Sequence, residues 1–157
     1  MSIIKKLPSI TIHVTVKNAE ATIKKCIDSL LALDYPNKQI YITEAYSTDS
    51  TYDILKQFGN KIRLERLRGN APSAFNHMIN KTSTPFVAFT DADCVVDKNW
   101  LKNLIKAFNS DEIIAAGGFC KTPNDVNKLQ RLIGIELESR FNEMPRYVTR
   151  LPTMNLC

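Results

Sequence analysis

Apolar and polar residues along this chain follow two periods in turn, which predicts strands that alternate with helices. Short apolar runs have the length and composition of strands, and between them apolar residues recur every three or four positions, as on one face of a helix. The expected strands are Ile10–Val16, Gln39–Thr43, Ile62–Arg66, Phe86–Phe89 and Ile113–Phe119. The expected helices run from an N-cap at Asn18 to Leu33, from the cap cluster Ser47–Ser50 to Phe58, and over Ser73–Asn80, Lys98–Phe108 and the amphipathic stretch Asp125–Phe141.

This alternation predicts the fold class. Strands followed by helices indicate an α/β protein, built as a three-layer α/β/α sandwich with a mainly parallel sheet covered on both faces. The chain has 157 residues, of which 44% are hydrophobic and 24% are charged, values that are ordinary for a soluble globular protein. That length is enough for one domain with a substantial core, so we expect a single domain over residues 1–157.

Net charge and cysteine content say little about the binding partner and the cellular location of the protein. The net charge of +5 suits an anionic partner, such as a phosphorylated ligand, an acidic membrane surface or nucleic acid, without choosing among them. The cysteines are scattered without metal-finger spacing, so we interpret them as reduced thiols of a cytoplasmic protein. No apolar run is long enough to span a bilayer, and no signal peptide opens the chain. The four cysteines are Cys26, Cys94, Cys120 and Cys157.

The strand Phe86–Phe89 leads into two carboxylates, Asp91 and Asp93, which are separated by one residue. If the extended backbone continues to Asp93, the period of two places both carboxylates on the same side. Two neighbouring carboxylates are stable when they are protonated, solvated or bridged by a cation, and oxygen ligands suit Mg²⁺ or Mn²⁺. The sequence therefore predicts a metal site here. The alternative is a polar turn that caps the next helix, a role for which Asp97 is already available.

Three polar strand ends are expected to meet in space. In open parallel sheets, ligands bind beyond the carboxyl ends of the strands, and those ends are Thr15–Asn18, Glu44–Asp49 and Asp91–Asp93. Glu44 could accept hydrogen bonds from a base or a ribose. Arg68 follows the third strand and could approach a phosphate. Helix capping is favoured over ligand binding for Asn18, Ser47 and Asp49, and a solvated sheet edge is favoured for Arg66.

The familiar phosphate-binding loops are missing from the sequence. There is no G-x-x-x-x-G-K-[ST] loop and no G-x-G-x-x-G after the first strand, which argues against P-loop, dinucleotide-binding and nucleotidyltransferase proteins. His13 and His77 are not placed as a ligand pair, and we expect His13 to be a hydrogen-bonded core residue. The aromatic residues occupy core-like positions, so we expect no nucleic acid partner. A site without such a loop can neutralise a diphosphate with a cation, which the paired carboxylates would hold.

The order of these features resembles the amino-terminal part of the GT-A glycosyltransferases of family 2. The resemblance covers nearly all of residues 8–157 and rests on several motifs in the same order and at the same spacing. The motifs are T-V-K-N-A-E at Thr15–Glu20, the stretch Cys26–Asn37, S-T-D-S-T at Ser47–Thr51, N-A-P-S-A-F-N at Asn70–Asn76, F-T-D-A-D and V-V-D-K-N-W-L within Phe89–Leu101, and T-M-N-L-C at Thr153–Cys157.

The resemblance implies an enzyme that transfers a sugar from a nucleoside diphosphate donor with inversion at the anomeric carbon. It implies that Thr15 and Val16 line the nucleoside pocket, that Glu44 stands where the family has an aspartate contacting the base, and that Asp91 and Asp93 lie at a Mn²⁺ or Mg²⁺ ion. The residues expected to bind the nucleotide sugar are Thr15, Val16, Asn18, Glu44, Arg68, Asn76, Asp91, Ala92 and Asp93.

Three departures from the family pattern qualify this expectation. Glu44-Ala45 replaces the usual Asp-Asp pair, and Ala71 falls where many members carry a lysine. The family's general base lies beyond Cys157, so we expect an incomplete domain that holds the donor half of the site and turns over poorly by itself. The alternatives are a non-catalytic nucleotide-sugar binding module and a truncated, inactive fragment. The acceptor stays open among a saccharide, a lipid-linked molecule and a protein, and a longer protein could sit at the cytoplasmic face of the membrane.

Overall fold

The computed structural model describes residues 7–145, 147–149 and 155–156, which form one five-stranded sheet with flanking helices. The strand order is β3-β2-β1-β4-β5. The first four strands are parallel, and β5 runs antiparallel to β4. The strands are β1 (Ile10–Val16), β2 (Lys38–Glu44), β3 (Arg63–Arg66), β4 (Phe86–Thr90) and β5 (Asn155–Leu156).

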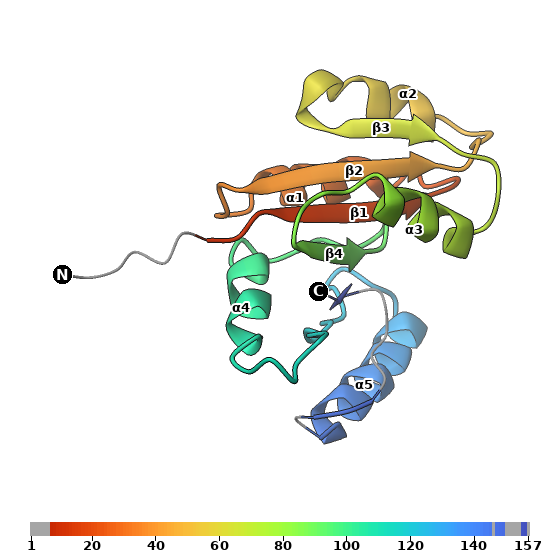
Figure 1. Cartoon of the computed structure of the whole chain (residues 1–157). Coiled ribbons are helices and arrows are strands. Elements are labelled where there is room, and N and C mark those ends of the chain that lie inside the picture. The colour runs from red at the N-terminus through yellow and green to blue at the C-terminus, as the bar shows by residue number, and fades with distance from the viewer. Residues whose placement is uncertain (1–6, 146, 150–154, 157) are drawn as a thin grey trace.

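Helices cover both faces of the sheet, which confirms the predicted three-layer α/β fold. In Figure 1, α1 and α2 lie together behind the sheet, and α3 lies in front of β1 and β2. The helices are α1 (Ile23–Leu31), α2 (Thr51–Lys56), α3 (Ala71–Asn80), α4 (Trp100–Ala107) and α5 (Lys128–Glu143), with a short 3₁₀ turn at Gly59–Lys61. Of the described helices, none combines the length and the apolar character needed to cross a bilayer.

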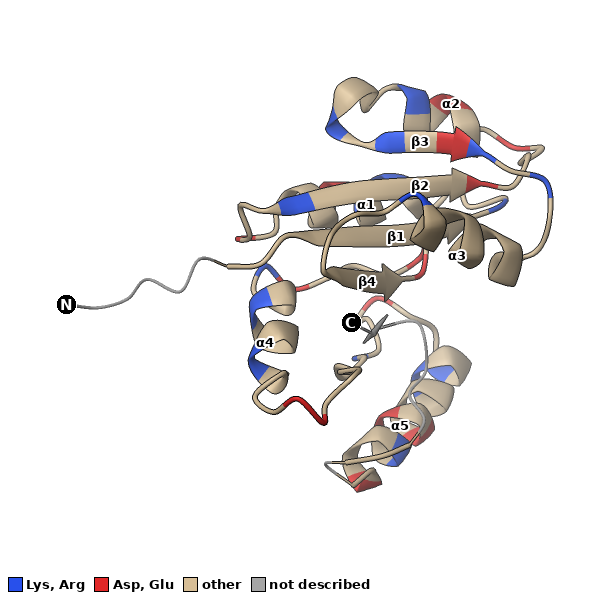
Figure 2. Cartoon of the chain, viewed as in Figure 1, with Lys and Arg blue, Asp and Glu red and all other residues tan. Residues whose placement is uncertain are grey.

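The core centres on β1, the middle strand of the sheet, which lies between β2 and β4. Figure 2 shows that β1 carries no charged residue, while charges gather at strand ends, helices and loops. Ile12 and Val14 of β1 are fully buried, as is Ile42 of β2. Burial of one such side chain contributes roughly 1.5–3 kcal/mol. The buried face of α1 repeats at helical spacing, with Ile23, Cys26, Ile27 and Leu30.

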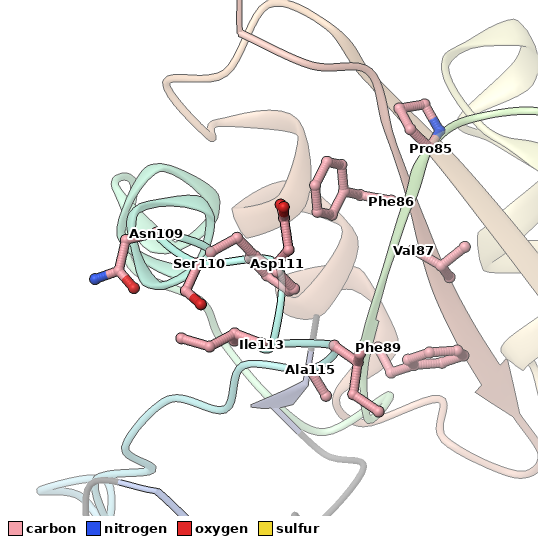
Figure 3. A pocket seen from close by; sticks show the side chains of 11 residues that line it. Pro85, Phe86, Val87, Phe89, Asn109, Ser110, Asp111, Ile113 and Ala115 are labelled. Atoms are coloured by element: carbon pink, nitrogen blue, oxygen red, sulfur yellow. The ribbon is translucent and has the colours of Figure 1, made fainter.

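The predicted strand over Ile113–Phe119 is wrong. That segment is irregular except for an isolated bridge at Gly117, and the side chain of Ile114 is 92% exposed. A strand needs a partner with free backbone groups, but β5 pairs with the last two residues of β4, Phe89 and Thr90. Farther back along β4, a hollow of about 850 Å³ separates its edge from the segment that follows α4 (Figure 3).

The predicted helix near Asp125–Phe141 exists, but its apolar residues do not pack into the core. The helix begins after a capping box formed by Asn127 and Gln130 and projects away from the sheet in Figure 1. Gly134 is its buried residue, and Leu129 is 67% exposed. The sequence periodicity predicted a helix with an apolar face, but it did not predict which part of the protein, if any, packs against that face. The other half-exposed apolar residues of this helix are Leu132, Ile133, Ile135 and Leu137.

Candidate functional site

A cavity of about 250 Å³ opens at the carboxyl ends of β1 and β2, beside the start of α3. Thr15 and Val16 line it, at the place where the sequence predicted a nucleoside pocket. Mostly apolar walls with a few polar groups are typical of small-molecule sites. The other residues that line the cavity are Lys17, Thr43, Ala45, Leu67, Gly69, Asn70, Ala71 and Ala74. Most of them were not among the residues that the sequence predicted to bind a ligand.

Local chemistry at the start of α3 explains the open wall of this cavity. The side chain of Asn70 caps the helix by accepting a hydrogen bond from the Ser73 backbone N–H, at 3.0 Å. Pro72 occupies the first turn, where its missing N–H costs nothing. Ala71 and Ala74 then face the cavity with small side chains. Ala71, where the resemblance led us to expect a lysine, therefore brings no positive charge to this wall of the cavity.

Asn18 does not cap α1, contrary to the prediction. The helix begins at Ile23, and Asn18 adopts a positive φ of 51° in the preceding loop. Its backbone N–H donates to Ser47 Oγ at 2.9 Å, and its Oδ1 accepts from the Thr48 backbone N–H at 2.9 Å. These two bonds join the loop after β1 to the loop after β2. Asn18 therefore shapes the rim of the site, and the described residues lining the cavity do not include it.

Asp49 strengthens the same junction. Its Oδ1 accepts from the Thr51 backbone N–H at 3.0 Å, and its Oδ2 accepts from the Glu20 backbone N–H at 3.1 Å. Hydrogen bonding by the Thr51 side chain is the main reason why the pKa of Asp49 is lowered. Asp49 is not the N-cap of α2, contrary to the prediction, because Ser50 occupies that position. Its carboxylate bonds the first residue of the helix and links the two loops.

Glu44 ends β2 but does not line the cavity. Its side chain is fully buried, accepts from the Ser47 backbone N–H, and pairs with Arg66 Nε at 2.6 Å. Burial alone would raise the pKa of Glu44, but the hydrogen bonds from Ser47 and Arg66 outweigh it and lower the pKa. Arg66 was expected at a solvated edge, and this carboxylate is its unpredicted partner. Contact between Glu44 and a base stays a prediction.

A stack of cationic and aromatic side chains lies beside this pair. The Arg66 guanidinium packs 4.2 Å from the Tyr46 ring centre and 4.1 Å from that of Tyr52, and Arg68 lies 4.4 Å from that of Tyr46. Tyr46 has a positive φ of 54°, a strained conformation for a bulky residue. Arg68 sits between two cavity-lining residues, Leu67 and Gly69, so the stack borders the cavity.

The two predicted metal ligands lie together, but not by the predicted geometry. β4 ends at Thr90, and Asp91–Cys94 forms a turn in which the Cys94 backbone N–H donates to the Asp91 carbonyl at 3.1 Å. Asp91, Asp93 and Cys94 each offer one possible ligand atom, and these three atoms lie within 4.8 Å of one another. Burial, followed by the charge of Asp93, raises the pKa of Asp91. Two carboxylates and a thiol at this spacing fit a divalent metal ion.

Helix α1 holds this turn from behind. Cys26 Sγ donates to the Asp91 carbonyl at 3.5 Å, and Ser29 Oγ accepts from the Val96 backbone N–H at 3.2 Å. Burial raises the pKa of Cys26 to about 12, so this residue is a neutral core thiol. Because β1 and β4 are parallel neighbours, the turn and the cavity both lie at the carboxyl edge of the sheet (Figure 1).

Comparison with known proteins identifies the family. The sequence model of Glycosyl transferase family 2 matches residues 11–156. The chain belongs to glycosyl transferase family 2. It is similar to the β-monoglucosyldiacylglycerol synthase of Nostoc sp., with 32% identity over 68% of this chain and 25% of the synthase. It is also similar to the poly-β-1,6-N-acetyl-D-glucosamine synthase of Staphylococcus aureus, with 27% identity over 97% of this chain and 38% of that enzyme. The family 2 chain thus spans well under half the length of these relatives.

Solved structures confirm the GT-A fold of this family 2 chain. The mannosyltransferase PcManGT of Pyrobaculum calidifontis, in complex with GDP-Man and Mn²⁺, superposes with a TM-score of 0.64 at 24% identity, covering 75% of this chain and 37% of that one. S. aureus TarS 1-349, in complex with UDP, gives a TM-score of 0.64 at 22% identity, covering 76% of this chain and 37% of that one. At these identities the likeness establishes the fold.

Two of the predicted donor-binding residues of the family 2 chain lie beside the site. Ala92 separates the two aspartates and packs against the core. Asn76 is exposed on α3 and is not among the described residues that line the cavity. The larger hollow of Figure 3 is a different place, because Pro85 and Phe86 in its wall lie at the amino end of β4, away from Asp91.

His13 is the buried core residue that the sequence predicted. Its Nε2 lies 2.9 Å from Thr43 Oγ1, and its ring packs edge-on against Phe75 and Phe89. Burial, followed by the charge of His77, lowers the pKa of His13 to about 4. The other histidine, His77, lies on α3, and its Nε2 is 2.7 Å from the Glu65 carboxylate.

Proposed function

We propose that this chain forms the donor-binding half of an inverting, metal-dependent glycosyltransferase that transfers a sugar from a nucleoside diphosphate. The observation that carries this proposal is the Asp91–Asp93–Cys94 ligand set at the same sheet edge as the cavity lined by Thr15 and Val16. The nucleoside enters that cavity, and its diphosphate extends toward the acidic turn. Two proteins of the same fold support this proposal: the mannosyltransferase PcManGT in complex with GDP-Man and Mn²⁺, and the glucosyl-3-phosphoglycerate synthase of Mycobacterium tuberculosis in complex with Mn²⁺, UDP and glucosyl-3-phosphoglycerate.

The chemistry needs stabilisation of the leaving diphosphate. A divalent ion at this site would supply it by offsetting the negative charge that develops as the glycosidic bond breaks. Asp91 and Asp93 would hold the ion, while Thr15 and Val16 position the nucleoside. Glu44 holds Arg66 and the Ser47 backbone in place, so its contribution to donor binding passes through the loop after β2.

Transfer with inversion also needs a base that accepts the acceptor's proton. The carboxylates of Glu44 and Asp49, at the described site, are engaged in bonds that shape it. We therefore propose that the 157-residue chain binds a donor but turns over poorly or not at all. The acceptor stays open between saccharide, lipid-linked and protein classes, and the cytoplasmic location stays a prediction.

Nucleotide binding tests the proposal directly. Thermal-shift and calorimetric titrations with uridine, guanosine and thymidine diphosphates, each with and without Mn²⁺, should show one nucleotide that stabilises the protein in a Mn²⁺-dependent way. Asp93→Asn should weaken that binding at least about tenfold, because it removes a charged ligand. Asp125→Asn is the matched control, since it removes one exposed carboxylate elsewhere in the chain. Equal affinity in the wild type and Asp93→Asn would refute the metal role.

A non-catalytic binding module is the second candidate, favoured by the engagement of the Glu44 and Asp49 carboxylates in bonds that shape the site. Nucleotide release from nucleotide-sugar donors, measured with and without saccharide acceptors, separates the two functions. If the wild-type chain turns over and Asp93→Asn abolishes that turnover, the chain is an active transferase. Mn²⁺-dependent binding without turnover supports the module or an incomplete enzyme.

A further inference from the structure

We propose that the Cys94 thiol is a third ligand of the Asp91–Asp93 metal site and gives that site a preference for thiophilic divalent ions, such as Zn²⁺ and Cd²⁺, over Mg²⁺. The inference deepens the proposed function, because it concerns the ion at the same site, and it names the residue that selects the ion. Aspartates alone are hard oxygen ligands that suit Mg²⁺, Ca²⁺ and Mn²⁺, whereas a thiolate is a soft ligand that favours zinc-like ions.

The spacing of the ligand atoms supports a shared ion. The Cys94 thiol donates a hydrogen bond to Asp93 Oδ1, with 3.8 Å between sulfur and oxygen, and one atom of each of the three side chains lies within 4.8 Å of the others. An ion would take the place of the thiol proton in this contact. Metal–sulfur and metal–oxygen bonds of about 2.3 and 2.1 Å place two tetrahedral ligands about 3.6 Å apart. The observed separation between sulfur and carboxylate is therefore close to that of two ligands on one ion, so a small side-chain rotation completes the site.

The turn also explains why this thiol, and not its neighbour, reaches the ion. The bond from the Cys94 backbone N–H to the Asp91 carbonyl folds Cys94 back beside the two carboxylates, and Cys94 is only partly buried. Cys26 is fully buried in the core and donates its thiol to the Asp91 carbonyl, behind the turn. Both aspartates are exposed, so solvent and ions reach the open side of the turn.

Ligation by this residue is a proton exchange. The S–H bond of Cys94 breaks, its proton passes to solvent, and the sulfur electron pair forms the metal–sulfur bond. No oxidant or reductant takes part. Binding of a thiophilic ion should therefore release one more proton than binding of Mg²⁺ to the same site.

Cadmium titration of the full chain tests the inference. Sulfur-to-cadmium charge transfer absorbs in the ultraviolet, so a band that saturates with Cd²⁺ reports thiolate ligation without any need for enzymatic activity. We expect the band in the wild type, its loss in Cys94→Ser, and Cd²⁺ binding weaker by at least about tenfold in that variant. Mg²⁺ affinity should stay unchanged. Cys120→Ser is the matched control and should behave as the wild type does.

An equal band in Cys94→Ser, or no band in the wild type at saturating Cd²⁺, would overturn the assignment. If Cys94→Ser does not fold, X-ray absorption of the zinc-loaded Cys120→Ser/Cys157→Ser double variant decides instead: a zinc–sulfur distance of about 2.3 Å supports the assignment, and an oxygen-only shell overturns it. Wild-type nucleotide binding with Mn²⁺ is measured in parallel. A band that depends on Cys94 without any nucleotide binding would refute the proposed function and leave the ligand assignment standing.

Discussion

Replacing His13 with phenylalanine should make the protein less sensitive to acid. His13 is fully buried, its Nδ1 has no hydrogen-bond partner among the described residues, and its pKa is lowered to about 4. In the unfolded chain a histidine takes up its proton near pH 6.5. The stability that depends on neutral His13 is therefore fully present above pH 6.5 and is lost as the pH falls toward 4.

The size of this effect follows from the two pKa values. Each unit of difference corresponds to about 1.4 kcal/mol, so protonation of His13 in the unfolded chain lowers the free energy of unfolding by about 2 kcal/mol between pH 7 and pH 5. Phenylalanine fits among the neighbouring rings of Phe75 and Phe89 but leaves the Thr43 hydroxyl without its partner. His13→Phe should therefore be about 1 kcal/mol less stable at pH 7.

Urea unfolding of the wild type and His13→Phe at pH 7 and pH 5 measures both quantities. The loss of stability between the two pH values should be about 2 kcal/mol smaller in the variant. Carboxylates with lowered pKa values, such as Glu44, add acid sensitivity equally to both proteins, so only the difference between the proteins is interpreted. His77→Gln removes the chain's other histidine and should keep most of the wild-type acid sensitivity. The same pH dependence in the wild type and His13→Phe would refute the reasoning.

Two further substitutions probe the packing around the site and the position of α5. Arg66→Ala leaves the buried Glu44 carboxylate without its cation and should lower the free energy of unfolding in urea by about 3 kcal/mol. Arg66→Lys keeps the positive charge and should lower it less. Equal losses in the two variants would mean that the charge does not matter. Gly134→Ala places a Cβ about 2.0 Å from Thr122 Oγ1, so α5 should shift away from this segment. Hydrogen exchange should then become faster in α5 but not in β1, and unchanged exchange in α5 would contradict the contact.

Signals that act over a few residues determined much of this protein. The apolar run of β1 and the period of α1 predicted both elements, since burial and backbone pairing follow from local pattern. The helix predicted over Ser73–Asn80 exists but begins two residues earlier, at Ala71, because Asn70 caps it and Pro72 fits its first turn. The placement of Thr15 and Val16 at a cavity followed from the rule that ligands bind beyond the carboxyl ends of parallel strands.

Only the tertiary structure decided which partner each polar side chain takes. Glu44 pairs with Arg66, and Asn18 bonds to the loop after β2, two partners that the sequence did not predict. Cys94 joined the two aspartates because the chain turns after Thr90 instead of staying extended. A local sequence pattern shows which polar groups need a hydrogen-bond partner and which apolar side chains need burial. Strands and loops that are distant in the sequence provide those partners once the chain folds. The tertiary structure therefore decides which polar side chains stay free to bind a ligand.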